Sequence, residues 1–168
     1  MLKIAIRIFS FLVFVCLFVC LISCKQAESL PNKFAGTWYD TEYIVPGRSS
    51  IKINKDSSFS YRSRGCQWGS VSKGKWKIIG DSIELNSTNS DTCYKMFPFV
   101  ECISFGENRK KDIMTIPNCD SKDDAFFAIF KKEIFYIKND SLLYKLKLSS
   151  NCPDSLKIVF AKTQKIKK

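Results

Sequence analysis

The fold is decided by the stretch Gly74-Lys75-Trp76-Lys77-Ile78-Ile79-Gly80-Asp81-Ser82-Ile83-Glu84-Leu85. Apolar and polar residues alternate on both sides of its central Gly-Asp pair. Trp76 and Ile78 share one face before the pair, and Ile83 and Leu85 share one face after it. A period of two is typical of a strand that buries one face, and Gly followed by Asp is a turn signal. The stretch therefore predicts two antiparallel strands joined by a tight turn.

The same alternation recurs from Phe34 onward. Apolar residues occupy every second position in four further stretches: Ile51–Ile53, Phe59–Tyr61, Leu142–Leu148 and Leu156–Phe160. Lys55-Asp56-Ser57 and Asn139-Asp140 are turn signals between such runs. We count about nine to eleven short strands and no convincing amphipathic helix. We therefore expect an all-β fold, a single antiparallel meander closed into a small barrel of about eight to ten strands, because closure removes exposed strand edges.

The middle of the chain departs from this pattern. Between Cys93 and Asp124 the alternation fails, and we expect longer loops there that are stapled by cysteines. Asn118–Asp124 is acidic, but it lacks the Gly and the closing Glu of a calcium loop, so we interpret it as a solvated turn and expect no metal site.

The first 23 residues have the order of a secretory signal peptide. Lys3 and Arg7 precede an apolar run without charge, which is too short to span a bilayer comfortably. The run ends in Leu21-Ile22-Ser23-Cys24, which resembles the lipobox of bacterial lipoproteins. That resemblance implies cleavage before Cys24, acylation of its thiol, and attachment to a membrane outside the cytoplasm, with the outer membrane as our expectation.

These features divide the chain into four parts. We expect a lipoprotein signal peptide at 1–23, a lipidated N-terminus and linker at 24–33, a barrel domain at 34–163 and a basic tail at 164–168. The linker is short, since Lys25 to Asn32 can stretch over at most ~27 Å. The folded domain would therefore stay close to the lipid surface.

Five cysteines remain in the expected domain: Cys66, Cys93, Cys102, Cys119 and Cys152. Their wide spacing does not resemble a zinc site, and disulfides are the usual state of cysteines in exported proteins. We expect two disulfides and one unpaired thiol. Because four cysteines can pair in three ways, leaving out each of the five in turn gives fifteen possible arrangements. Cys93 with Cys102 is the first pair that we expect, because the loop between them is short.

Charge and composition limit the function. The formal net charge is +11, and removal of Lys3 and Arg7 with the signal peptide leaves +9. Only five of the 27 basic residues are Arg, and most Lys residues alternate with apolar ones, so we expect a solvated sheet face rather than nucleic-acid binding. Attraction to an anionic membrane or polymer is the more plausible role for the charge. The chain has no His, which removes the commonest general base and zinc ligand.

Gly36-Thr37-Trp38 resembles the Gly-x-Trp signature of lipocalins and related small barrels. In that family the Trp lies across the closed end of the barrel and a basic residue from the final strand packs over its ring. The resemblance implies that role for Lys162, two residues past Phe160. The wider strand pattern is similar to that of lipocalin-like lipoproteins frequent in Bacteroidota. It implies a barrel with a possible apolar pocket, although the many aromatic residues are also what a filled barrel core needs.

We therefore expect a membrane-anchored envelope lipoprotein with a non-catalytic binding or envelope-maintenance role and no cofactor. Its partner would be an apolar small molecule or a protein. The alternative is a small barrel that inhibits or docks onto another protein, such as a hydrolase. A ligand carrier would have an internal apolar cavity, whereas an inhibitor would have a filled barrel and an exposed, ordered loop.

Overall fold

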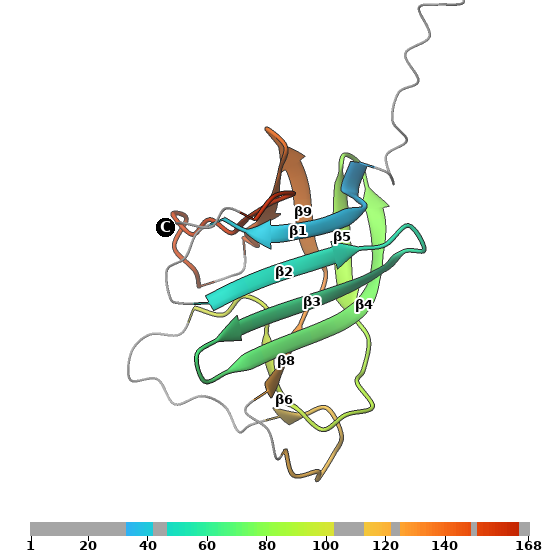
Figure 1. Cartoon of the computed structure of the whole chain (residues 1–168), viewed down its shortest axis with the longest axis vertical. Helices are drawn as coiled ribbons and strands as arrows, with labels where there is room; N and C mark the ends of the chain where they lie inside the picture. The colour runs from blue at the N-terminus through green and yellow to red at the C-terminus, as the bar shows by residue number, and fades with distance from the viewer. Residues whose placement is uncertain (1–32, 42–46, 103–112, 122–124, 149–150, 165–168) are drawn as a thin grey trace, which may run out of the picture.

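The computed structural model describes residues 33–41, 47–102, 113–121, 125–148 and 151–164. The expected signal peptide, the expected acylation site Cys24 and most of the expected linker and tail lie outside these ranges. Within them, no helix is long and apolar enough to cross a membrane. A helical turn at residues 33–34 precedes the first strand. The described residues form eleven strands (Figure 1): β1 Gly36–Asp40, β2 Gly47–Ile53, β3 Ser58–Gly65, β4 Gly69–Ile79, β5 Ser82–Ser87, β6 Lys95–Pro98, β7 Ile113–Met114, β8 Ala125–Ile129, β9 Glu133–Lys138, β10 Ser141–Lys145 and β11 Val159–Ala161.

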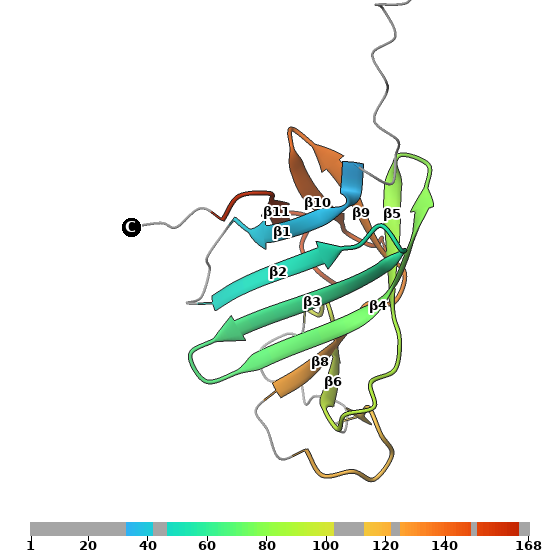
Figure 2. The same ribbon diagram turned by 45° about the vertical axis from the view of Figure 1, so that its right-hand side comes forward.

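Eight of these strands close into an antiparallel barrel, which confirms the predicted fold class. The ring runs β1-β2-β3-β4-β5-β9-β10-β11, and β11 returns to pair with β1 (Figure 2). The predicted turns lie between consecutive strands of the ring. Asn139 and Asp140 both have positive φ, 50° and 56°, which is the backbone of the type I′ turn that suits a two-residue hairpin.

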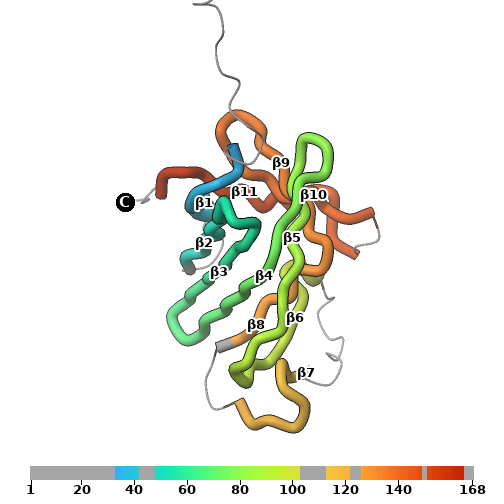
Figure 3. Tube along the Cα trace, turned by 90° about the vertical axis from the view of Figure 1, so that its right-hand side faces the viewer, coloured from blue at the N-terminus to red at the C-terminus, as the bar shows by residue number. Residues whose placement is uncertain are grey.

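The meander is interrupted between β5 and β9, a feature that the sequence analysis did not predict. There the chain leaves the ring and forms β6, β7 and β8, which extend the sheet beyond β4 (Figure 3). The first residues of β4 pair in parallel with β8, and β8 pairs in parallel with β6. The last part of β4 pairs with β5 instead. The long β4 thus belongs to both the barrel and this insertion, which we define as residues 88–130.

The barrel encloses one continuous hydrophobic core. Its buried members come from the ring strands, from the turn before β1 and from the end of the insertion: Phe34, Trp38, Ile51, Ile53, Phe59, Trp76, Ile83, Leu85, Ala128, Phe130, Phe135, Leu142, Tyr144 and Phe160. The inward positions match the predicted alternation over most of the ring. The prediction fails at Leu148, because β10 ends at Lys145 and the Leu148 side chain is fully exposed.

Two disulfides hold the irregular segments, and one of the cysteines that the structure describes is unpaired. Cys93 bonds to Cys119 within the insertion, and Cys102 bonds to Cys152, which lies between β10 and β11. Cys66 is free and exposed in the β3–β4 hairpin. The pairing of Cys93 with Cys102 is wrong. The expectation assumed an irregular loop between them, but β6 extends the chain there and carries the two residues apart.

These bonds predict the result of peptide mapping. Unreduced protein should yield linked peptides for Cys93–Cys119 and Cys102–Cys152, and alkylation before reduction should label Cys66 within the domain. The bonds separate residues by 26 and 50 positions, so replacing either pair by Ser should lower the free energy of unfolding by about 3–4 kcal/mol. Chemical denaturation measures this loss. A peptide that links Cys93 to Cys102, or five alkylated thiols, would contradict the arrangement.

Candidate functional site

One end of the barrel is closed by Trp38. Its side chain is buried on β1, and its indole N–H donates a hydrogen bond of 2.8 Å to the carbonyl oxygen of Phe34. Phe34, in the turn before β1, is itself fully buried. An indole needs a partner for its polar N–H when it is buried, and the turn supplies one. The turn and the first strand therefore form one packed unit.

Lys162 packs over this unit from the opposite end of the chain. Its Nζ lies 4.6 Å from the centroid of the Trp38 ring and donates a hydrogen bond of 3.0 Å to the carbonyl oxygen of Ala35. Gly36 has a φ of 126°, and a Cβ added there would lie 3.5 Å from the ammonium group. That backbone conformation is open to Gly and strained for other residues. The structure thus brings together the three residues of the Gly-x-Trp resemblance, at a site built for packing.

The other end of the barrel is occupied by aromatic rings. Phe99, which follows β6, stacks on Phe130 with ring centroids 4.2 Å apart. The Phe99 ring also makes edge contacts with Tyr61 and Tyr144, at 5.5 and 5.7 Å. Phe130 is buried, and its ring contacts that of Phe59 in the core. We call Phe99 and Phe130 the aromatic lid, because the insertion places both of them against the side chains of the ring.

A buried carboxylate lies beside this lid. Glu133, at the start of β9, accepts a hydrogen bond of 2.7 Å from the Tyr144 hydroxyl and forms an ion pair with Lys147. Burial, and then the hydrogen bond to the Glu133 carboxylate and its negative charge, raise the pKa of Tyr144 well above its usual value. The hydroxyl therefore stays protonated and donates to the carboxylate at neutral pH. Glu133, Tyr144 and Lys147 thus form a buried network whose hydrogen bonds are satisfied.

The described residues contain no group of three or more His, Cys, Asp or Glu that could hold a metal ion. In the acidic segment Asn118–Asp124, Cys119 is engaged in a disulfide, and residues 122–124 lie outside the described ranges. Glu84 is buried on β5. Burial by itself would raise its pKa, but hydrogen bonds from Asn86 and Lys77 outweigh that effect and lower it. It is a paired anion.

Sequence reasoning missed the aromatic lid and the buried carboxylate. A signal for the carboxylate was present, because Glu133 shares a strand face with Phe135 and Ile137, and an acid on an apolar face calls for a buried partner. No comparable signal marked Phe99. It lies in a segment without alternation, and its stacking partner is 31 positions away in the chain.

The contact between Trp38 and Lys162 predicts coupled stability effects. Trp38→Ala should lower the free energy of unfolding by ~3–5 kcal/mol, as large-to-small aromatic changes in cores do. Lys162→Ala should cost about 1 kcal/mol through lost packing and cation–π attraction. In the double mutant the Lys162 effect should largely vanish. Denaturation of the four proteins of this cycle measures the coupling, and strictly additive losses would contradict the contact.

The raised pKa of Tyr144 predicts that the free energy of unfolding depends on pH, and that Tyr144→Phe removes this dependence. At pH 7 the variant should be less stable by about 1–2 kcal/mol, since a hydrogen bond to a charged group is lost. An acid whose pKa is raised by folding stabilises the folded state at pH values below its pKa in the unfolded chain. This stabilisation is lost as the pH rises from that pKa toward the higher pKa of the folded state. The difference between the two proteins should therefore shrink above pH ~10, where the unfolded Tyr ionises. Urea titrations from pH 7 to 11 measure it; a constant difference would contradict the raised pKa.

No protein-family model, no curated protein and no solved structure matches the sequence or fold of this chain significantly.

Proposed function

We propose that this chain is a lipid-anchored protein of a bacterial envelope that acts without catalysis, by binding partners on the outer surface of its barrel. The observation that carries the proposal is the aromatic lid. An eight-stranded barrel is only just wide enough inside for side chains or one small ligand. Here Phe99 and Phe130 stack at one end and Trp38 covers the other, and the side chains between them form one buried cluster. That filling supports recognition on the outside of the barrel.

The anchoring part of the proposal is supported by the N-terminal sequence. Lys3 and Arg7, the uncharged apolar run and the Leu21-Ile22-Ser23-Cys24 ending have the order required for export and acylation. The two disulfides agree with export, because thiols are kept reduced in the cytosol. Gly36, Trp38 and Lys162 support placement among lipocalin-like lipoproteins in particular.

The non-catalytic part is supported by the chemistry of the side chains. The chain has no His. Ser70 and Lys73, which could suggest a nucleophile and its base, lie on opposite faces of β4, with Ser70 buried and Lys73 exposed. In the alternative function, the barrel docks onto a protein such as a hydrolase, and it would also use its outer surface for that contact. This alternative is favoured by the β3–β4 hairpin, where the side chain of Trp68 is 42% exposed.

Native mass spectrometry of protein purified from its own host tests both parts. The wild-type mass should equal residues 24–168 plus acyl groups, with no further small molecule bound in a 1:1 ratio. Cys24→Ala should lack the acyl mass and should not enter the detergent phase as a mature protein. Cys20→Ala is the matched control, since it alters a neighbouring Cys of the same segment and should behave like the wild type.

The two parts can fail separately. An apolar molecule retained 1:1 with the wild-type domain would overturn binding on the outer surface. A Cys24→Ala protein that partitions into detergent at the mature mass would overturn the anchor.

A further inference from the structure

The outer face of β2, β3 and β4 is positively charged. These three strands contain seven basic residues and no acidic one. Lys77 forms an ion pair with Glu84 of β5 at 3.2 Å. The other six are exposed and alternate with the inward positions of their strands. We call them the basic face: Arg48, Lys52, Arg62, Arg64, Lys73 and Lys75.

The strand register arranges these residues in rows. Residues that pair directly across antiparallel strands point to the same side of a sheet. Three rows lie on the outer side: Arg48 with Arg64, Ser50 with Arg62, and Lys52 with Ser60 and Lys73. Cations and hydroxyl groups therefore stand side by side on the outside of the barrel.

The basic face extends along β3 and β4 for about 20 Å. Arg64 pairs with Gly69 at one end of the β3–β4 ladder, and Lys75 pairs with Ser58 at the other. Six residues along a strand cover ~20 Å, and alternate residues lie ~7 Å apart. A chain-like ligand that lies along β3 would therefore meet a cation at about every second residue of the strand.

The arginines of this face have no acidic partner among the described residues. Arg48, Arg62 and Arg64 form no ion pair there. An acid reaches the face at its rim, where Asp91 lies 3.8 Å from Lys73 and both side chains are exposed. Guanidinium groups that are free of acids suit bidentate contacts with the carboxylate or phosphate groups of a ligand.

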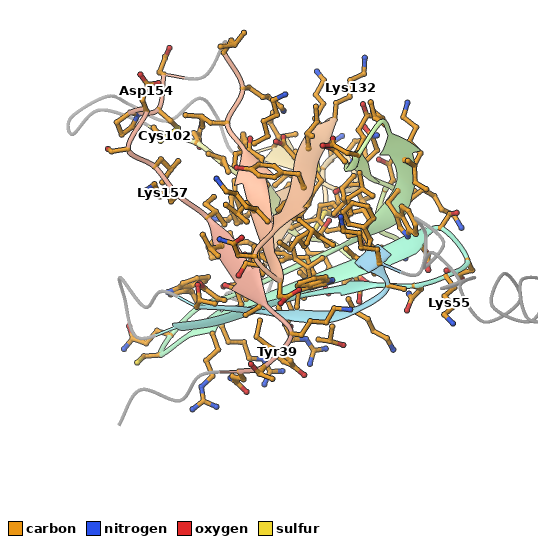
Figure 4. All side chains as sticks on the ribbon, turned by 90° about the horizontal axis from the view of Figure 1, so that it is seen from above. Tyr39, Lys55, Cys102, Lys132, Asp154 and Lys157 are labelled. Atoms are coloured by element: carbon orange, nitrogen blue, oxygen red, sulfur yellow. A yellow bond between two sulfur atoms is a disulfide. The ribbon has the colours of Figure 1, made fainter. Side chains whose placement is uncertain are left out.

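Hydroxyl groups of the same face are also free to bind a ligand. Ser50 and Ser60 stand in the rows of cations, and Tyr39 of β1 pairs with Ser50. Figure 4 shows Tyr39 projecting from the side of the sheet away from the barrel interior. Within the described part of the chain these three side chains make no hydrogen bond, whereas the inward Ser49 and Ser63 bond to each other at 2.7 Å.

The face lacks the exposed apolar side chains that a bilayer or an apolar partner would contact. None of the large apolar residues that are exposed in the described part of the chain lies on β1, β2 or β3. On β4 they occupy the last two positions, Ile78 and Ile79. Trp68 packs against Gly65 on the inward side of β3, to which Ser63 also points. The charge and the hydroxyl groups therefore favour a hydrophilic anion.

We propose that the basic face binds an anionic polysaccharide that lies along β3. Its acidic groups pair with the arginines and lysines, and its hydroxyls bond to Ser50, Ser60 and Tyr39. A nucleic acid would use the same charges, but its bases stack on aromatic side chains, and Tyr39 is the one aromatic residue at an outward position of β1 to β4. This inference rests on the proposed function and deepens it, because it names a partner for the outer surface.

Calorimetric titration of the processed, full-length protein in a nonionic detergent tests the inference. The probes are galacturonic acid, its trimer and its octamer, with neutral dextran as the uncharged polymer. The octamer should bind about tenfold more tightly than the trimer, because it spans the face and its contacts form on one chain. Added salt should weaken this binding. No binding of the octamer, equal binding of the monomer, or binding of dextran would contradict the proposal.

Two double variants locate the site. Arg62→Gln with Arg64→Gln should weaken octamer binding about tenfold, roughly threefold for each exposed ion pair that is lost. Lys138→Gln with Lys145→Gln is the matched control, since it removes two charges from exposed residues of β9 and β10, and β10 lies opposite β3 in the ring. The control should bind like the wild type. Equal loss in both variants would mean that overall charge attracts the octamer, and would refute the basic face as a site.

A third variant separates a polysaccharide from other anions. Ser50→Ala with Ser60→Ala keeps every charge and removes two hydroxyl groups. It should weaken octamer binding about fivefold and leave the binding of inorganic polyphosphate unchanged. Unchanged octamer binding would overturn the polysaccharide. The same conclusion would follow if a single-stranded oligonucleotide or phosphatidylglycerol vesicles bound more tightly than the octamer at equal anion concentration.

Failure of this inference is distinguishable from failure of the proposed function. Absence of octamer binding refutes the polysaccharide and leaves the filled barrel and the anchor intact. An apolar molecule retained 1:1 in native mass spectrometry refutes the filled barrel, which the octamer titration does not measure.

Discussion

The pairing of β11 with β1 is the constraint on which the rest of the molecule depends. β11 is three residues long, yet it must satisfy the free edges of both β1 and β10. Contacts at its two ends compensate for its length. Thr41 donates its backbone N–H and its hydroxyl to the carbonyl oxygen of Val159, and Lys162 reaches across to Trp38. Without this closure two strand edges would lie open to other chains.

Closure in turn determines what the interior can hold. A ring of eight strands has an interior close to the volume of its own side chains, and this chain fills it with large aromatic ones. The insertion adds to that filling, because it leaves the ring after β5 and brings Phe99 and Phe130 back over the barrel end. Cys102–Cys152 ties the segment after β6 to the approach to β11, so the lid and the closing strand are held by the same bond. This filled interior is why the proposed function places recognition on the outside of the barrel.

The sequence predicts an interaction well when its partners lie close together in the chain, and poorly when they lie far apart. Alternation and turn residues are local, so the strands around Gly80-Asp81 and Asn139-Asp140 and the closed all-β fold were predictable. The parallel pairing of Gly69 with Ala125 joins residues 56 positions apart, and no local pattern announces it. The wrong pairing of Cys93 with Cys102 has the same origin. The prediction relied on their closeness in the chain, but β6 lies between them and separates them in space. Lys162 could be placed near Trp38 only through a family resemblance, since spacing alone says nothing about partners at opposite ends of a chain.

The distribution of charge also changes meaning once the ring is closed. From the sequence, basic residues alternating with apolar ones are explained as protection of exposed strand edges. β2 and β3, however, have paired neighbours on both sides, so they have no edge to protect. Solubility does not require like charges to face each other, and a mixture of Lys and Glu would serve it without the repulsion between Arg48 and Arg64. The facing pair of Arg48 and Arg64 is therefore a local cost in stability that neither edge protection nor solubility explains.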